Sequence, residues 1–176
     1  MSGAQASKPI GRRLAAYVGM AALACGGAAL FAQATKPEPK SLAWHSEQQL
    51  ALASLRAEDG WRWEEGGVMW RFAPKNEGPG GAGPRPSVSD TVTVHYAGTF
   101  VDGETFDSSY DRGQPATFPL GRLVKAWQVA IPNMAVGDTI ELVAPAAMAY
   151  GPVGRGPIPG GATLRFKVQL IAIGDS

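Results

Sequence analysis

The residues that could do chemistry in this 176-residue chain are aromatic and branched side chains near predicted turns, rather than nucleophiles. No Gly-x-Ser-x-Gly, phosphate-binding glycine loop or His-Glu zinc motif occurs in the sequence. The aromatic and branched residues are Tyr96, Phe106, Phe118, Val124, Trp127, Tyr150 and Phe166. In a small domain such side chains usually form the core, but they can also line a dry pocket for an apolar ring. The pattern alone leaves both interpretations open.

The composition argues against metal and nucleic-acid chemistry. His45 and His95 are the only histidines, and neither stands in a Cys or carboxylate cluster at metal-ligand spacing. Cys25 is the only cysteine, so an intrachain disulfide is excluded. The formal net charge is +1 and the lysines and arginines are scattered, whereas a nucleic-acid-binding surface needs them clustered. We therefore expect a site without metal or nucleic acid.

Three alternating segments, 91–96, 139–142 and 164–170, predict the strands that must position these aromatic residues. Their apolar faces would carry Val92, Val94 and Tyr96, then Ile140 and Leu142, then Leu164, Phe166, Val168 and Leu170. Polar residues occupy the opposite faces, which would place His95 in solvent. One apolar and one polar face on each strand is typical of an antiparallel sheet that covers a core on one side.

Something must cover the apolar face of that sheet. Residues 123–130 are the only good helical candidate in this part of the chain, and Pro132 would end the helix. Residues 67–72 look like an additional first strand. The prediction is an α+β fold, a twisted antiparallel β-sheet wrapped around one short α-helix.

The first 34 residues have the layout of an export signal. Basic residues precede an uncharged, Ala-rich run at 14–32, and Ala32 and Ala34 fit a signal-peptidase site. Residues 1–34 would then be a signal peptide, and the mature protein would be periplasmic. The run nearly reaches the roughly 20 residues that span a bilayer, so an uncleaved anchor in the inner membrane is the alternative. Cys25 offers a weaker alternative, a lipoprotein site.

Residues 35–65 are predicted to be a linker followed by a short helix. Two prolines lie in 36–40, and good helix formers with several leucines fill 41–55. This helix could pack on the following domain or on a second copy of the chain, which would make a homodimer. Residues 66–176 are expected to form one domain.

A series of short motifs occurs in order between about residues 67 and 173. The motifs are Val94-His95-Tyr96-Ala97-Gly98-Thr99, Asp102-Gly103-Glu104-Thr105-Phe106-Asp107-Ser108-Ser109, Phe118-Pro119-Leu120-Gly121, Val124-Lys125-Ala126-Trp127, Met134-Ala135-Val136-Gly137-Asp138, Ala149-Tyr150-Gly151, Ile158-Pro159 and Ala162-Thr163-Leu164-Arg165-Phe166. In order and spacing the series resembles the FKBP-type peptidyl-prolyl cis-trans isomerases, the macrolide-binding immunophilins. One motif alone would be weak support, whereas the ordered series is strong.

The resemblance implies a set of site residues. Those implied to be catalytic are Asp107, Tyr150, Trp127 and Phe106, and those implied to bind substrate are Tyr96, Phe118, Leu123, Val124, Ile158, Phe166 and Arg112. Trp127 would form the floor under the substrate proline ring, and Asp107 and Tyr150 would be polar groups at the rim. The backbone N–H of Val124 would bind a substrate carbonyl, and Arg112 would pair with Asp107.

The implied activity is rotation about X-Pro peptide bonds, which would assist the folding of exported proteins. Proline-containing polypeptides would be the substrates, macrolides would be inhibitors, and no cofactor would be needed. One alternative is a non-catalytic chaperone module that binds proline-containing peptides. A further alternative is an envelope assembly factor in which the segment before Gly66 supplies dimerisation or docking.

The sequence departs from the family pattern at three places. Ala116 stands where a pocket-wall position is often aromatic, so one side of the cleft should be open. Ala126 replaces a glycine before Trp127, which could shift the start of the helix. Residues 150–162 appear about one residue short and are rich in Gly and Pro. These departures bear on substrate preference and macrolide affinity more than on basic activity.

Overall fold

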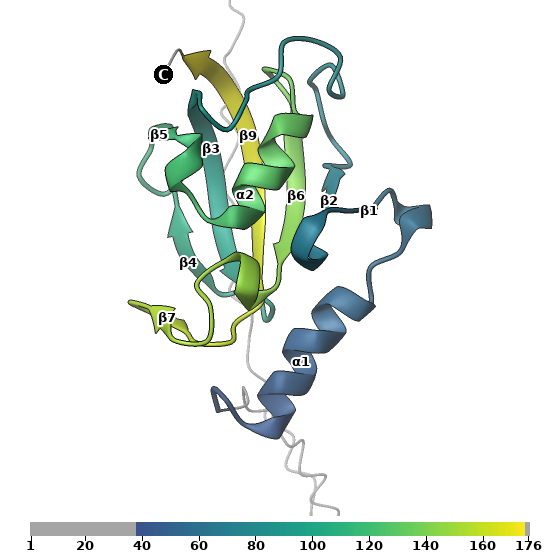
Figure 1. Ribbon diagram of the computed structural model, residues 1–176, viewed down its shortest axis with the longest axis vertical. Helices are drawn as coiled ribbons and strands as arrows, with labels where there is room; N and C mark the ends of the chain where they lie inside the picture. The colour runs from purple at the N-terminus through teal and green to yellow at the C-terminus, as the bar shows by residue number, and fades with distance from the viewer. Residues whose placement is uncertain (1–37, 175–176) are drawn as a thin grey trace, which may run out of the picture. The chain divides into compact units, whose positions relative to one another are not determined.

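An antiparallel sheet with two long strands, β3 (Thr91–Phe100) and β9 (Leu164–Gly174), frames the protein in a computed structural model that describes residues 38–174 (Figure 1). The shorter strands of this sheet are β1 (Arg62–Trp63), β2 (Met69–Phe72), β4 (Thr105–Ser108), β5 (Ala116–Pro119) and β6 (Thr139–Ala144). The strand order is β1-β2-β6-β9-β3-β4, with β5 also paired to β3, and every pair is antiparallel. The predicted α+β architecture is confirmed.

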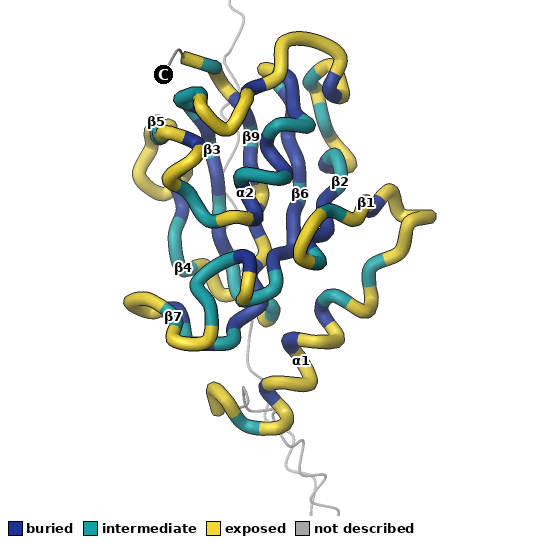
Figure 2. Tube along the Cα trace, in the orientation of Figure 1, coloured by how far each residue is buried: buried dark blue, intermediate teal, exposed yellow. Residues whose placement is uncertain are grey.

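The core lies between the sheet and the short helix α2 (Lys125–Ala130), which crosses one sheet face (Figure 1). Along β3, Val92, Val94 and Tyr96 are buried and the residues between them are half-buried, so the period-two pattern points the apolar side chains at the helix. Buried positions follow β3, β6, β9 and α2 (Figure 2). Burial of apolar area at about 25 cal/mol per Å² is what holds these layers together.

The helix begins later than the predicted range of 123–130. Leu123 and Val124 have extended backbones, Val124 is the N-cap, and the helix proper starts at Lys125. The turn η3 (Leu120–Arg122) precedes the helix and η4 (Ile131–Asn133), which contains Pro132, follows it. The later start leaves Leu123 and Val124 as a bend between the two helical pieces.

A glycine- and proline-rich segment follows β6 and covers one end of the sheet. It contains the turn η5 (Ala146–Met148) and a two-stranded hairpin, β7 (Gly154–Arg155) and β8 (Ile158–Pro159). Gly154 has a φ of +81°, and a Cβ there would lie 2.1 Å from the carbonyl oxygen of Ile158. Only glycine permits so close an approach, which explains part of the composition of this segment.

The helix α1 (Leu42–Ala53) packs on the same domain, which is the first of the two alternatives left open by the sequence. Ser41 caps it, with its hydroxyl accepting a hydrogen bond from the Trp44 N–H at 3.1 Å. Trp44 is buried in the main core. The Gln48 side-chain oxygen accepts a hydrogen bond from the Thr163 N–H at 2.8 Å, and the Thr163 hydroxyl donates to the Gln48 carbonyl at 3.2 Å.

The start of the sheet differs from the sequence prediction. The strand expected at 67–72 covers only Met69–Phe72. The chain before it forms the strand β1, which is joined to β2 by the turn η2 (Glu65–Gly67) and pairs with it. A further turn, η1 (Ala57–Asp59), precedes β1. The segment between α1 and β2 thus folds back on the sheet instead of leading straight into it.

The second face of the sheet is not uniformly polar, contrary to expectation. Trp61, Met69 and Val143 are buried in a small cluster there, with Leu52 and Leu55 packed against it. The predicted signal or anchor segment lies outside the described residues. Within residues 38–174, no helix has the length and apolar character needed to cross a membrane.

Candidate functional site

A cavity of about 370 Å³ gathers side chains from β3, β4, β5, α2 and β9, which are far apart in the sequence. Its lining consists of Tyr96, Phe106, Asp107, Phe118, Leu123, Val124, Trp127, Tyr150, Arg155 and Phe166. The lining is mainly aromatic and aliphatic, with a few polar groups among them. This is the composition expected of a site for a small apolar group held in one orientation.

The aromatic rings of the cavity hold one another edge to face. Trp127 on α2 contacts Tyr96 with a centroid separation of 5.3 Å and an interplanar angle of 80°. It contacts Phe166 at 5.6 Å and 86°, and Phe166 contacts Phe106 at 5.8 Å and 89°. Edge-to-face pairs are favoured by the ring quadrupoles and each adds about 0.5–1.5 kcal/mol beyond area burial. The rings therefore form a preorganised wall that does not have to be assembled around a ligand.

Asp107, Tyr96 and Arg112 form a hydrogen-bonded triangle at the rim. The Tyr96 hydroxyl donates to Asp107 Oδ2 at 2.6 Å and accepts from Arg112 Nη2 at 2.8 Å. Arg112 Nη1 also donates to Asp107 Oδ1, which closes the triangle with an ion pair. The hydroxyl is thereby fixed with its hydrogen toward the carboxylate.

The triangle sets the charge states at the rim. Partial burial raises the pKa of Asp107, but the hydrogen bonds from Tyr96 and Arg112 outweigh it, so the pKa lies below its ordinary value. Burial raises the pKa of Tyr96, and the hydrogen bond to Asp107 raises it further. At neutral pH the site therefore presents a carboxylate, a neutral phenol and a guanidinium.

The backbone of Tyr96 is held by a residue whose role the sequence did not reveal. Ser109 is fully buried, and its hydroxyl accepts from the Tyr96 N–H at 2.7 Å while its own N–H donates to the Tyr96 carbonyl at 2.9 Å. His95 Nδ1 lies 3.0 Å from the same hydroxyl, and the His95 ring stacks on Tyr110. His95 is thus half-buried and bonded, not solvated as expected, because the β4–β5 connection folds over its strand.

Gly98 on β3 makes room for the Phe106 ring. A Cβ at this position would lie 2.6 Å from Phe106 Cζ and 3.1 Å from Phe166 Cε1. The first distance is shorter than real Cβ contacts and the second is unusually tight, so any other residue here would displace the Phe106 ring. The glycine is therefore needed where two aromatic side chains cross the strand.

Two further groups of the cavity have no partner inside the described part of the chain. The Trp127 indole N–H is fully buried and forms no hydrogen bond there. A buried unpaired donor costs about 1–3 kcal/mol, and such exceptions call for an explanation at a functional site. The Val124 N–H, at the N-cap of α2, likewise donates to no described backbone carbonyl.

Most of the residues singled out from the sequence meet in this cavity, but two do not line it. Ile158 is buried in the core beside it, and Arg112 acts from the rim through Asp107 and Tyr96. Arg155, on the β7–β8 hairpin, lines the cavity and was not anticipated. A single arginine in a Gly/Pro-rich segment carries no periodic signal, so only the hairpin's fold brings it to the site.

Comparisons with known proteins agree with this geometry. A family model described as FKBP-type peptidyl-prolyl cis-trans isomerase matches residues 83–171. The chain is 40% identical over 122 residues to the FKBP-type peptidyl-prolyl cis-trans isomerase FkpA of Aeromonas hydrophila, covering 69% of this chain and 44% of the relative. It is 47% identical over 95 residues to the outer membrane protein MIP of Legionella longbeachae, covering 53% of this chain and 40% of the relative. The chain thus spans less than half the length of these curated relatives.

A solved structure gives the same picture for the fold. The peptidyl-prolyl cis-trans isomerase from Pseudomonas syringae pv. tomato str. DC3000 matches with a TM-score of 0.65 and 31% identity, covering 76% of this chain and 95% of that one. The family model covers half of the sequence and includes strands β3 to β6, most of β9, the helix α2 and the aromatic cavity. This chain belongs to the FKBP-type peptidyl-prolyl cis-trans isomerase family.

Proposed function

We propose that this chain is a peptidyl-prolyl cis-trans isomerase that acts on X-Pro bonds of polypeptides exported from the cytoplasm. The observation that carries the proposal is the edge-to-face aromatic cavity with the Asp107–Tyr96–Arg112 triangle at its rim. The apolar wall suits a proline ring, and the triangle adds fixed polar groups beside it. Family membership supports the same activity.

The chemistry of the reaction fits a site without a nucleophile. Rotation about an X-Pro bond breaks amide resonance across a barrier of about 18–20 kcal/mol, but makes and cuts no covalent bond. A catalyst needs only to favour the twisted amide over the planar forms. The planar amide is more polarised and better hydrated, so a dry aromatic cavity disfavours it relative to the transition state. Reaching millisecond turnover requires about 10⁴-fold acceleration, or roughly 5–6 kcal/mol.

Each residue then has a proposed role. Trp127, buried at the centre of the ring contacts, supports the proline ring, while Phe106, Phe118 and Phe166 enclose it. The Val124 N–H holds a substrate carbonyl, and Asp107 and Tyr150 meet the rotating amide at the rim. Arg112 positions Asp107 and Tyr96. We propose macrolides of the immunophilin-binding class as competitive inhibitors, because they would occupy the same apolar walls.

Isomerisation of a Leu-Pro test peptide by the purified full chain tests the activity. Wild-type protein should accelerate the reaction well above its uncatalysed rate. Asp107→Ala should lower kcat/KM by about tenfold or more, because it removes the fixed carboxylate at the rim. Trp127→Leu should lower it as well, because it removes the ring at the cavity floor.

Asp111→Ala is the matched control, because Asp111 is exposed and four residues from Asp107 but does not line the cavity. This variant should keep the wild-type rate. Near-ultraviolet circular dichroism of every variant shows whether the fold is intact. A folded wild-type protein that binds the peptide without accelerating isomerisation would refute the enzyme and favour the non-catalytic chaperone module.

We also propose that the protein is exported and that residues 1–34 direct it. The basic residues before the apolar run at 14–32 support this, as does the likeness to a relative named as an outer membrane protein. N-terminal sequencing of the protein recovered from the periplasm of a Gram-negative host should begin at Thr35. Retention of residues 1–34 in the membrane fraction would favour the anchor instead, and recovery from the cytoplasm would contradict export.

A further inference from the structure

Arg155 lines the aromatic cavity, and the proposed isomerisation gives it no role. Asp107 and Arg155 are the charged side chains of the lining. The Asp107 carboxylate already accepts hydrogen bonds from Tyr96 and Arg112. Arg155 is exposed and forms neither a hydrogen bond nor an ion pair with any of residues 38–174. The cavity therefore presents one positive charge that no residue in this range neutralises.

The β7–β8 hairpin directs Arg155 toward the cavity. Arg155 pairs with Ile158 across the hairpin, and residues directly opposite each other in an antiparallel pair extend from the same face. Ile158 is 7% exposed and belongs to the main core beside the cavity. The hairpin is tied back at its start by the Gly154 N–H, which donates to the Tyr150 carbonyl at 3.2 Å. Arg155 is therefore held at the mouth of the cavity, where a bound peptide can reach its guanidinium.

A guanidinium at this place matches an acidic side chain of the substrate. Its planar set of N–H donors can pair with both oxygens of one carboxylate, whereas it repels a lysine or an arginine. A cavity of about 370 Å³ accommodates a proline with its neighbours rather than a long segment. The carboxylate would thus belong to a residue adjacent to the proline.

We propose that Arg155 is a specificity-determining residue, which favours substrates with an aspartate or glutamate next to the proline. The inference rests on the proposed isomerase function and adds a sequence preference to it. The apolar walls would select the proline ring, and Arg155 would select among proline-containing segments by their charge.

Two sets of acetylated and amidated tetrapeptides test the preference on the full chain. In Ala-Xaa-Pro-Phe the varied residue precedes the proline, and in Ala-Leu-Pro-Xaa it follows. Xaa is glutamate, glutamine or lysine, and exchange NMR measures kcat/KM for each peptide. In one set the glutamate peptide should exceed the lysine peptide by about fivefold at low salt, with glutamine between them. The ratio should shrink at about 1 M salt, and equal values within both sets would overturn the proposal.

Variants at Arg155 connect the preference to this side chain. Arg155→Gln should remove the preference for glutamate, Arg155→Glu should reverse it, and Arg155→Lys should retain its direction. The readout is the ratio between peptides measured on one variant, so a general loss of activity does not imitate the effect. A glutamate preference that persists in Arg155→Gln would overturn the assignment.

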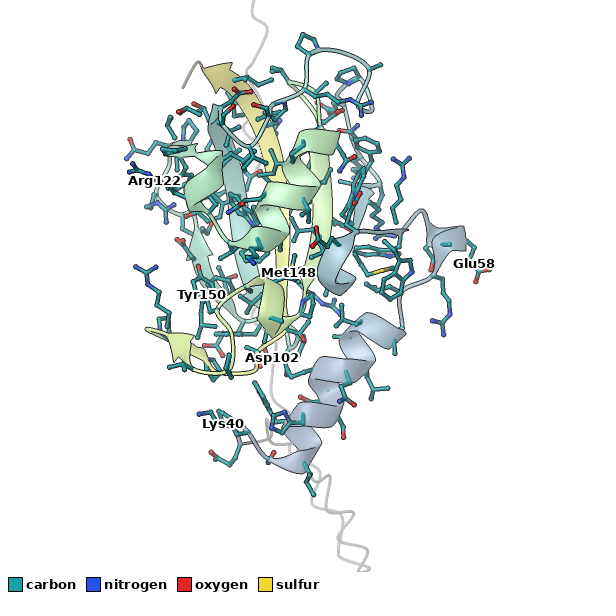
Figure 3. All side chains as sticks on the ribbon, in the orientation of Figure 1. Lys40, Glu58, Asp102, Arg122, Met148 and Tyr150 are labelled. Carbon is teal, nitrogen blue, oxygen red and sulfur yellow. The ribbon has the colours of Figure 1, made fainter. Side chains whose placement is uncertain are left out.

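Arg122→Glu is the matched control, because it changes the net charge as Arg155→Glu does. Arg122 is an exposed arginine of the turn η3 that does not line the cavity, and Figure 3 shows it apart from Tyr150 and the β7–β8 hairpin. This variant should keep the wild-type order of the peptides. An equal effect of Arg122→Glu and Arg155→Glu would assign the preference to overall charge and reject a specific role of Arg155.

A binding measurement separates the preference from the catalytic activity. If no peptide is isomerised, the proposed function fails, but fluorescence anisotropy of the labelled glutamate and lysine peptides still reports on Arg155. Tighter binding of the glutamate peptide that Arg155→Glu reverses would support the role of Arg155 without catalysis. Equal binding of the two peptides by the wild-type protein would reject it.

Discussion

The ion pair between Asp107 and Arg112 is a contact whose role is not to stabilise the fold. Both side chains are 44% exposed, and pairs this accessible contribute about 0–1 kcal/mol to folding. The same two groups, however, fix both hydrogen-bonding directions of the Tyr96 hydroxyl. The triangle is therefore better suited to orienting groups at the cavity rim than to stabilising the fold.

The pKa of Asp107 predicts the pH dependence of activity. Because the folded pKa is below its ordinary value of about 3.9, the carboxylate stays ionised throughout the neutral range and is protonated only in strong acid. We expect kcat/KM to be constant from about pH 5 to pH 8 and to fall only below about pH 4. A pH–rate profile, read alongside circular dichroism to exclude acid unfolding, checks this.

Asp107→Asn is the control for that profile. It retains the shape of the side chain but cannot titrate. Its lower activity should therefore not fall further in the pH range in which Asp107 of the wild-type protein is protonated. A fall in wild-type activity centred near pH 6 would contradict the assignment, since no group of the triangle titrates there.

Among the elements, α1 shows how a short helix is stabilised by packing. Its buried face consists of Trp44, Gln48 and Ala51, spaced four and three residues apart, so the three side chains lie on one side. Trp44 inserts into the main core, while Gln48 joins the helix to Thr163 before β9. A helix of 12 residues is marginal in isolation, so these tertiary contacts hold it.

Trp44→Ala should therefore destabilise the protein by about 3–5 kcal/mol, the usual cost of removing a buried large aromatic ring. Urea unfolding followed by circular dichroism measures the change. Leu42→Ala is the matched control on the same helix, because Leu42 is 88% exposed and its truncation should change the free energy of unfolding little. A loss below about 1 kcal/mol for Trp44→Ala would show that α1 detaches without affecting the domain.

At the scale of the whole molecule, Asp138 ties a long loop to the sheet. The residue is fully buried, and its carboxylate accepts hydrogen bonds from Asn76 Nδ2 and the N–H groups of Gly80, Gly81 and Ala135 at 2.6–2.9 Å. These donors belong to the loop after β2 and the turn before β6. The Asp138 side chain thus accepts hydrogen bonds from a loop that has no helix or strand of its own.

Asp138→Ala should destabilise the protein by about 3 kcal/mol or more, because it leaves several buried donors unpaired. The native carboxylate should also make stability depend on pH. Burial raises the pKa of Asp138, but the hydrogen bonds outweigh it and the folded pKa lies below the ordinary value. The stabilisation is therefore complete above the unfolded-state pKa of about 3.9 and is lost as the pH falls through the folded pKa.

Urea unfolding at pH 7 and at about pH 3 measures both effects. Wild-type protein should lose more stability between these two conditions than Asp138→Ala does, since the variant has no such carboxylate to protonate. Asp111→Ala, at an exposed aspartate, should retain the wild-type dependence. The same loss of stability in wild type and Asp138→Ala would contradict the role of Asp138.

Much of the site could be predicted because its residues stand in short local patterns. The alternation of 91–96 and 164–170 assigns Tyr96 and Phe166 to the buried face of strands β3 and β9, and an ordered series of motifs then places Phe106, Asp107 and Trp127 with them. A period of two and a fixed motif spacing are properties of the sequence itself, so they can be recognised without the structure.

The remaining features depend on contacts between distant segments, which no local pattern encodes. Ser109 supports Tyr96, Arg155 reaches the aromatic cavity and Trp44 of α1 joins the main core, each by tertiary packing alone. The sequence by itself determined the three main strands, the aromatic set and the family. Only the tertiary structure decided the partners of His95 and the attachment of α1, because these depend on which surfaces meet when the sheet and helices pack.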